Sequence, residues 1–226
     1  MGVALIASLP SCKKFLAVNT NPNSPTTIEA SLVLPQAIVY TASTMGVSFH
    51  DYGSWQVGYF ANAGGFGGWG NTITYEFTTN SFTGLWSSTY DNLEDYEYII
   101  SSTTGRDTFA YFNATARIMK ALNYQLLADE YDQIPYEDAL KGLDALTPKY
   151  DAAQDVYKKL YTDLDEAIGV INNAKFPNAL GTADVVFGGN MTKWKQLANT
   201  LKLKLRIRVS KSTVFREILP SRLMDS

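Results

Sequence analysis

The chain has 226 residues, enough for one well-buried core or two small ones. Its apolar content of 46% and charged content of 18% are typical of a folded protein, and its net charge of −3 gives no overall attraction to nucleic acid. One cysteine, Cys12, excludes an internal disulfide, and one histidine, His50, argues against a zinc centre or a Ser-His-Asp triad. We therefore expect no metal, no cofactor and no nucleic-acid partner.

The first residues look like an export signal. An apolar run from Val3 to Leu9 is too short to span a bilayer but has the length of the apolar region of a signal peptide. Leu9 lies three positions before Cys12, and a small residue directly precedes this cysteine, which resembles the lipobox of bacterial lipoproteins. We expect residues 1–11 to be a lipoprotein signal peptide and Cys12 to carry the lipid. The alternative is a buried N-terminal strand with a free thiol.

The next segment, residues 12–27, is rich in Asn, Pro, Ser and Thr. Its two X-Pro steps bias the backbone toward extended or turn geometry. The segment is predicted to be a lipidated tether between a membrane anchor and the folded body.

Five later stretches repeat apolar residues every three or four positions, which predicts amphipathic helices. Trp86 and Trp194 fall on these apolar stripes, so both are expected in the core. Asp151, with Gln154 three positions later, is predicted to cap the fourth helix. The predicted helices cover about residues 27–44, 82–100, 106–129, 151–171 and 194–209.

Between about Val47 and Ser81 the helical pattern gives way to an aromatic, Gly-rich excursion. It contains GFGGWG, residues 65–70, which matches the G-x-G-x-x-G phosphate-binding pattern. That pattern needs a strand before it and a helix after it. Here the following Ile73, Tyr75 and Phe77 alternate with polar residues, which predicts a short strand. A nucleotide site is therefore disfavoured.

The excursion is instead the candidate ligand site. Flat aromatic faces stack on the C–H face of a sugar ring or on peptide side chains, and glycines let the backbone fold so that the rings stand out. Asn71, beside Trp69, adds a hydrogen-bond donor and acceptor. Alternatively, Trp55 and Phe66 pack the loop onto the helices. The predicted ligand-binding residues are Trp55, Tyr59, Trp69, Asn71 and Tyr75.

An acidic cluster raises the possibility of glycoside hydrolysis by two carboxylates. It contains Asp129, Glu130, Asp132, Glu137 and Asp138. Nothing in the pattern predicts an apolar pocket that would raise one of the pKa values. We interpret the cluster as a solvated helix end and turn, and predict that the protein is not an enzyme. Basic residues between Lys193 and Lys211 are similarly interpreted as stems that cover an amphipathic helix.

Four segments, in order along the chain, resemble the SusD/RagB-type outer-membrane lipoproteins of Bacteroidetes. After Lys211 the resemblance stops, and residues 212–226 have no counterpart. Asp132-Gln133 stands where Gly-Asp is usual. We therefore expect residues 28–211 to be the N-terminal part of a truncated SusD-like fold. The matching segments are CKKFLAVNTNPNSPT (12–26), IPYEDAL (134–140), LTPKYDAAQDVYKKLYTDLDEAI (146–168) and GNMTKWKQLANTLKLKLRIRVS (189–210).

This resemblance implies a mainly α fold whose helix pairs stack like tetratricopeptide repeats in an α-α superhelix. It also implies a lipid-anchored protein on the cell surface that binds a glycan or a peptide and delivers it to a SusC-like TonB-dependent outer-membrane transporter. Two other functions remain open. One is a glycan-degrading enzyme that uses the acidic cluster, and the other is a scaffold that contacts the transporter without binding a ligand.

Overall fold

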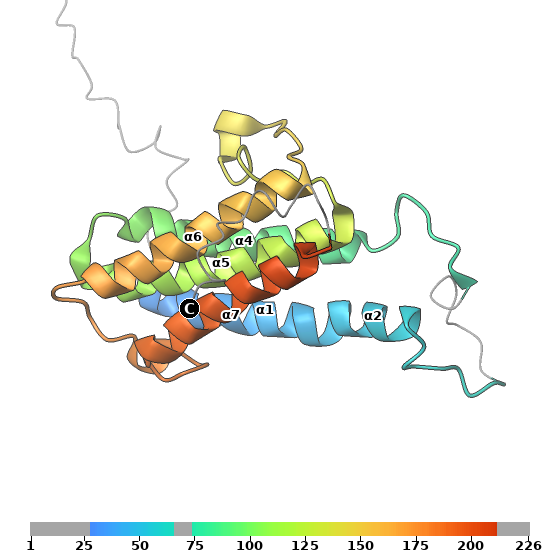
Figure 1. Ribbon diagram of the computed structural model, residues 1–226, viewed down its shortest axis with the longest axis horizontal. Helices are drawn as coiled ribbons and strands as arrows, with labels where there is room; N and C mark the ends of the chain where they lie inside the picture. Colours follow the sequence, from blue (N-terminus) through green and yellow to red (C-terminus); the bar gives the residue numbers. More distant parts are fainter. Residues whose placement is uncertain (1–27, 66–73, 212–226) are drawn as a thin grey trace, which may run out of the picture.

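A computed structural model describes residues 28–65 and 74–211, and these residues are mainly helical, with no strand among them (Figure 1). This confirms the predicted fold class. The expected signal peptide, tether and C-terminal tail lie outside the described residues. The helices are α1 (Ala30–Ser43), α2 (His50–Gln56), α4 (Thr83–Thr103), α5 (Ala110–Tyr131), α6 (Ala153–Asn173) and α7 (Met191–Val209).

Helix α5 is the centre of the body. It contacts α1, α4, α6 and α7, while α1 also packs on α4 and α7 on α6 (Figure 1). Its inward positions include Ala114, Ala116 and Ala121, which are buried and small enough to let the neighbouring helices approach closely. Each of α4, α5 and α6 packs on the helix that follows it, as the resemblance implied.

The prediction that Trp194 lies in the core is confirmed, because its side chain is fully buried on α7. Its indole Nε1 donates a hydrogen bond of 2.7 Å to Asp184. The Asp184 carboxylate also accepts backbone N–H bonds from Val186, Phe187 and Gly189 at 2.7 to 3.0 Å. The loop before α7 is thereby fixed to the helix through one carboxylate.

A buried polar cluster joins α1, α4 and α5. The Thr41 hydroxyl lies 2.8 Å from the Tyr96 hydroxyl and accepts amide N–H bonds from Asn92 at 2.6 Å and from Asn123 at 3.0 Å. All four side chains are almost completely buried. Because buried polar groups are stable only when they are paired, this cluster fixes how the three helices are placed relative to one another.

The predicted start of the aromatic excursion, at about Val47, is wrong. Helix α1 continues through a π-helical turn, Thr44–Phe49, into α2, so residues 47–56 are helical and Trp55 lies on a helix. Contacts between this turn and α4 stabilise a stretch whose own composition favours a loop. The run Ala30–Gln56 is long and apolar enough to cross a membrane, but its buried Leu34 and Ile38 place one face in the core.

Two local predictions are also wrong. Tyr75 has a φ of 58°, which a strand does not allow, and residues 74–78 form no strand. Helix α6 begins at Ala153 without a side-chain cap. The Asp151 carboxylate instead accepts the N–H groups of Tyr136 and Glu137, at 3.0 and 2.9 Å. Asp151 therefore secures the segment before it in the chain.

Candidate aromatic binding surface

The C-terminal end of α2 and the chain that follows it carry the first part of a candidate binding surface. Trp55 is half-buried, and its ring meets Phe60 edge to face, with centroids 5.7 Å apart. The backbone N–H of Tyr59 bonds the Ser54 carbonyl at 2.9 Å, which turns the chain back on α2. The Tyr59 side chain is left 84% exposed.

Tyr75 returns to the same end of α2 from later in the excursion. Its hydroxyl donates a hydrogen bond of 2.9 Å to the carbonyl of Gln56, the neighbour of Trp55. Its side chain is 59% exposed. The structure thus brings three of the predicted ligand-binding residues together. The other two, Trp69 and Asn71, lie outside the described residues, so their roles stay predictions.

A line of ring contacts joins this surface to the helical body. The ring of Tyr75 contacts Phe77, which contacts Phe82, which contacts Tyr52 of α2, with centroids 6.2, 5.1 and 4.3 Å apart. Burial and a hydrogen bond with Glu130 raise the pKa of Tyr52 to about 12. Tyr52 therefore stays a neutral phenol at physiological pH.

The line of rings continues along α4 to Tyr150, which was not predicted from the sequence as part of the site. The Tyr131 hydroxyl bonds the Phe82 carbonyl at 3.0 Å, and the ring of Tyr131 meets Trp86 edge to face at 5.0 Å. Trp86 also stacks on Tyr150. The two rings lie nearly parallel, at an interplanar angle of 20° with centroids 6.0 Å apart, and Tyr150 is 61% exposed. Trp86, expected in the core, is only partly buried.

We define the aromatic surface by its exposed or half-buried rings at this end of the molecule. An aromatic side chain offers a large, rigid apolar face at a low cost in conformational entropy. Rings that are exposed and also held by neighbouring rings are pre-organised to stack on a flat apolar face of a ligand. The surface consists of Tyr52, Trp55, Tyr59, Phe60, Tyr75, Phe77, Phe82, Trp86 and Tyr150.

The acidic cluster does not form a pair of opposed carboxylates. Asp129 pairs with Arg208 at 2.7 Å, Glu137 with Lys159 at 2.9 Å, and Asp138 with Lys141 at 2.9 Å. Asp132 is exposed in the turn after α5. Within residues 28–65 and 74–211, no three His, Cys, Asp or Glu side chains are placed to hold a metal ion.

One carboxylate of this cluster, Asp129, has a raised pKa. Burial raises it, against the opposing effects of a hydrogen bond from Tyr157 and the positive charge of Arg208. A general acid needs a raised pKa together with a second carboxylate across a substrate cleft. Because Asp129 is instead bound to Arg208 and Tyr157, its surroundings favour a structural ion pair between α5 and α7.

Comparison with known proteins gives a consistent result. Residues 22–219 match a family model, SusD-like, described as "Starch-binding associating with outer membrane". No curated protein matches the chain significantly. A solved structure described as a chitin-binding protein is 33% identical, with a TM-score of 0.56, and the match covers 63% of this chain and 32% of that one.

Two further structures share the fold. A SusD-like protein from Bacteroides thetaiotaomicron is 25% identical, with a TM-score of 0.62, over 80% of this chain and 38% of that one. A SusD homologue from Bacteroides fragilis is 25% identical, with a TM-score of 0.61, over 81% of this chain and 36% of that one. The chain thus spans about a third of the length of each of these structures.

Proposed function

The chain belongs to the SusD-like family, and on that premise we propose that it binds a glycan on the aromatic surface and delivers it to a SusC-like TonB-dependent transporter of the outer membrane. The proposed site also includes Trp69 and Asn71, which lie outside the described residues. No catalytic step and no cofactor are part of this proposal.

The observation that carries the proposal is the exposure of the rings around the end of α2. Tyr59 is 84% exposed and Tyr75 is 59% exposed, and both lie at the C-terminal end of α2. Exposed aromatic groups that gather on one surface mark an interaction site. A glycan is the better ligand because a sugar ring combines a flat C–H face with hydroxyls, and a relative 33% identical is described as chitin-binding.

The class of ligand is tested by calorimetric titration of the purified chain. The titrants are chito-oligosaccharides, malto-oligosaccharides and mixed-sequence peptides of similar length. We expect at least one oligosaccharide to bind weakly and the peptides not to bind, because the affinity comes from stacking and a few hydrogen bonds. Binding of peptides alone, or of none of these compounds, would refute the glycan proposal.

The contribution of the predicted central ring is tested with Trp69→Ala. Phe176→Ala is the matched control, because Phe176 is 79% exposed in the loop after α6, away from the aromatic surface. We expect Trp69→Ala to weaken oligosaccharide binding and the control to leave it unchanged. Equal binding by both variants would remove Trp69 from the site.

The anchor and the partner need separate experiments. Mass spectrometry of the mature protein should find acyl chains on Cys12, and Cys12→Ala should release the protein from the membrane fraction. Affinity purification of the lipidated protein should retain a TonB-dependent transporter. An unmodified thiol would contradict the anchor, and a transporter retained by a chain that binds no ligand would support the scaffold function.

The enzyme alternative makes a different prediction. If the acidic cluster hydrolysed glycans, the purified chain incubated with polysaccharide would release new reducing ends. We expect none above a heat-denatured control, since three of these carboxylates pair with cations. Release of reducing ends that is lost in Asp129→Asn would replace the proposal.

A further inference from the structure

A recess that shares no lining residue with the aromatic surface lies where α4, α5 and α6 meet the segment of residues 134–141. It has a volume of about 320 Å³ and is lined by charged and polar groups, with Arg117, Lys120, Tyr136 and Asp163 among them. A neighbouring recess of similar volume shares Arg117 and opens toward Asn113. Volumes of this order are in the range of small-molecule sites. We call the first recess the polar groove.

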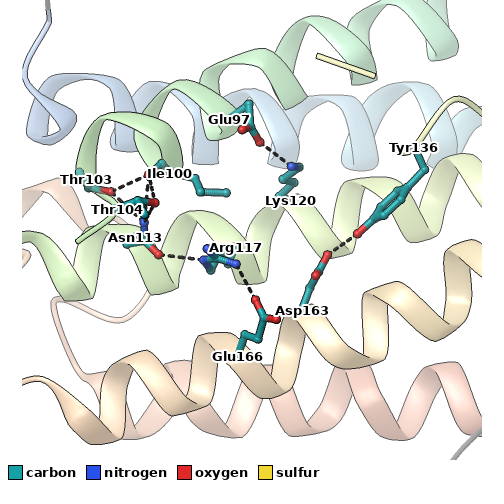
Figure 2. A network of polar contacts seen from close by, with 10 residues as sticks. All are labelled: Glu97, Ile100, Thr103, Thr104, Asn113, Arg117, Lys120, Tyr136, Asp163 and Glu166. Atoms are coloured by element: carbon teal, nitrogen blue, oxygen red, sulfur yellow. Dashed lines mark hydrogen bonds and ion pairs between the residues drawn. The ribbon is translucent and has the colours of Figure 1, made fainter. Parts of the chain in front are cut away.

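The charges in the polar groove alternate. Arg117 and Lys120 lie one turn apart on α5, with carboxylates from α4 on one side and from α6 on the other (Figure 2). Lys120 pairs with Glu97 of α4 at 2.5 Å, and Arg117 pairs with Glu166 of α6 at 3.0 Å. Cations and anions are therefore neutralised locally and do not gather into a positive and a negative pole.

Tyr136 forms a wall of the groove. Its hydroxyl donates a hydrogen bond to Asp163 (Figure 2). Its ring packs on the buried Tyr124, with centroids 4.5 Å apart. The segment that carries it is held by Asp151, whose side chain accepts two backbone N–H bonds and whose backbone exchanges two more with Ile134. The wall is therefore fixed in place before any ligand binds.

The groove keeps unused hydrogen-bonding capacity. A guanidinium has five N–H donors. Arg117 uses Nε to bond Asn113 at 2.8 Å and Nη1 to bond Glu166 at 3.0 Å, so further N–H groups of its guanidinium can still donate to a ligand. Asp163 accepts the Tyr136 hydroxyl through one oxygen, which leaves the other oxygen able to accept. Burial raises the pKa of Asp163, against the opposing effects of the Tyr136 hydrogen bond and the Lys120 charge. Its carboxyl group is thus partly withdrawn from water.

From this arrangement we infer that the polar groove is a second ligand site that takes one neutral sugar unit. Arg117, Lys120 and Asp163 would hydrogen-bond vicinal hydroxyls of the sugar, and the sugar ring would lie against Tyr136. A hydroxyl both donates and accepts, so it matches neighbouring donors and acceptors. An anion would meet Glu97, Glu137 and Asp163, and a zwitterion would find no separated poles. The choice of a sugar rests on the proposed function, whereas the position of the site does not.

The test is a nuclear magnetic resonance titration of the isotope-labelled chain with glucose, galactose, mannose and N-acetylglucosamine, each added alone. We expect one of these sugars to shift the Arg117 side-chain Nε–H signal and the backbone amides of residues 117–120 and 136–137 in a saturable way. Glucuronate and glycine are the charged comparisons. Shifts of these groove signals by a charged probe alone, or by no probe, would overturn the inference.

Variants separate recognition from folding. Arg117→Met keeps the aliphatic stem and Arg117→Lys keeps the charge, but both lose the planar donor fork. We expect both to weaken binding of the neutral sugar by at least about tenfold. The matched control is Lys158→Met, which removes an exposed cation paired with Asp155 outside the groove. If Arg117→Met fails to fold, Arg117→Lys decides, and unchanged binding by a folded Arg117 variant would refute the role of this residue and with it the site.

Failure of this site can be distinguished from failure of the proposed function. Tyr59→Ala should lower oligosaccharide affinity while the groove signals still shift with the monosaccharide. Arg117→Lys should move the groove shifts to at least about tenfold higher sugar concentration while the signals of Tyr59 and Tyr75 still respond to oligosaccharide. Loss of both responses in either variant would show a single site and contradict the inference.

Discussion

Aromatic residues serve two different purposes in this chain, one in the helical body and one at the end of α2. In the body, Trp194 and Tyr96 are fully buried, and each polar atom has a partner, Asp184 and Thr41 respectively. At the end of α2, Tyr59 is 84% exposed. The comparison shows that the surroundings of a ring, and not its residue type, decide whether it stabilises the fold or remains available to a ligand.

This difference predicts that stability and binding respond to different substitutions. Truncation of a body ring should lower the free energy of unfolding, and truncation of a surface ring should lower affinity with little change in stability. The predictions below test that separation.

The largest effect is expected for Trp194→Ala. It removes a fully buried indole and takes one donor from Asp184, so we expect a loss of about 3–5 kcal/mol in the free energy of unfolding. Urea denaturation followed by circular dichroism measures it. A loss below about 1 kcal/mol would show that the α7 contact is not part of the core.

A smaller loss is expected for Thr41→Val, which keeps the shape and removes the hydroxyl. Asn92, Asn123 and Tyr96 then lose a shared buried partner, which should cost about 2–3 kcal/mol. The control is Thr89→Val, because within residues 28–65 and 74–211 the buried Thr89 hydroxyl bonds only the carbonyl of Leu85. Equal losses in urea denaturation of the two variants would contradict a joint role for the cluster.

Asp184 predicts a pH dependence. Burial alone would raise its pKa, but N–H donors from Phe187, Trp194, Gly189 and Val186 together lower it below the ordinary value of 3.8. A lowered pKa contributes stability that is complete above the ordinary value and is lost as the pH falls through the folded-state pKa. Asp184→Asn should cost about 2 kcal/mol at pH 7.

The same variant tests the sign of this effect. The difference in unfolding free energy between the wild type and Asp184→Asn should stay constant down to about pH 5 and shrink once the pH falls below 3.8. Denaturation midpoints measured at several pH values give this profile. A difference that grows in acid would show that the carboxylate is destabilised by the fold.

The smallest effect concerns the turn after α5. Asp132 has a φ of 63° and a ψ of −67°, and Gln133 donates to the Tyr131 carbonyl at 2.7 Å, the geometry of a strained γ-turn. We expect Asp132→Gly to stabilise the protein by about 0.5–1 kcal/mol and Asp132→Ala not to stabilise it. Thermal unfolding compares them, and a gain in the alanine variant would refute backbone strain as the cause.

The long helices could be predicted from the sequence because their apolar periodicity reports the same packing that stabilises them. The positive φ of Asp132, 63°, was not predicted from the sequence. The prediction failed where tertiary contacts decide. Residues 47–56 continue the helix because the π-helical turn packs on α4, which no local pattern indicates.

Of the candidate site, the sequence indicated the aromatic excursion and three residues that lie at the C-terminal end of α2, Trp55, Tyr59 and Tyr75. It missed Tyr150, because stacking on Trp86 joins residues 64 positions apart (150 − 86). It also gave no sign of the polar groove, since Lys120 and Asp163 come together only when α4, α5 and α6 pack. Contacts between distant helices leave no short-range pattern.

The most direct test of the account is the affinity of Tyr59→Ala for the oligosaccharide that the wild type binds, measured by titration calorimetry beside Phe176→Ala. Both variants remove a highly exposed ring, so both should keep wild-type stability within about 0.5 kcal/mol. The account predicts that Tyr59→Ala binds about tenfold more weakly and that Phe176→Ala binds like the wild type. Equal affinities for all three proteins would contradict it.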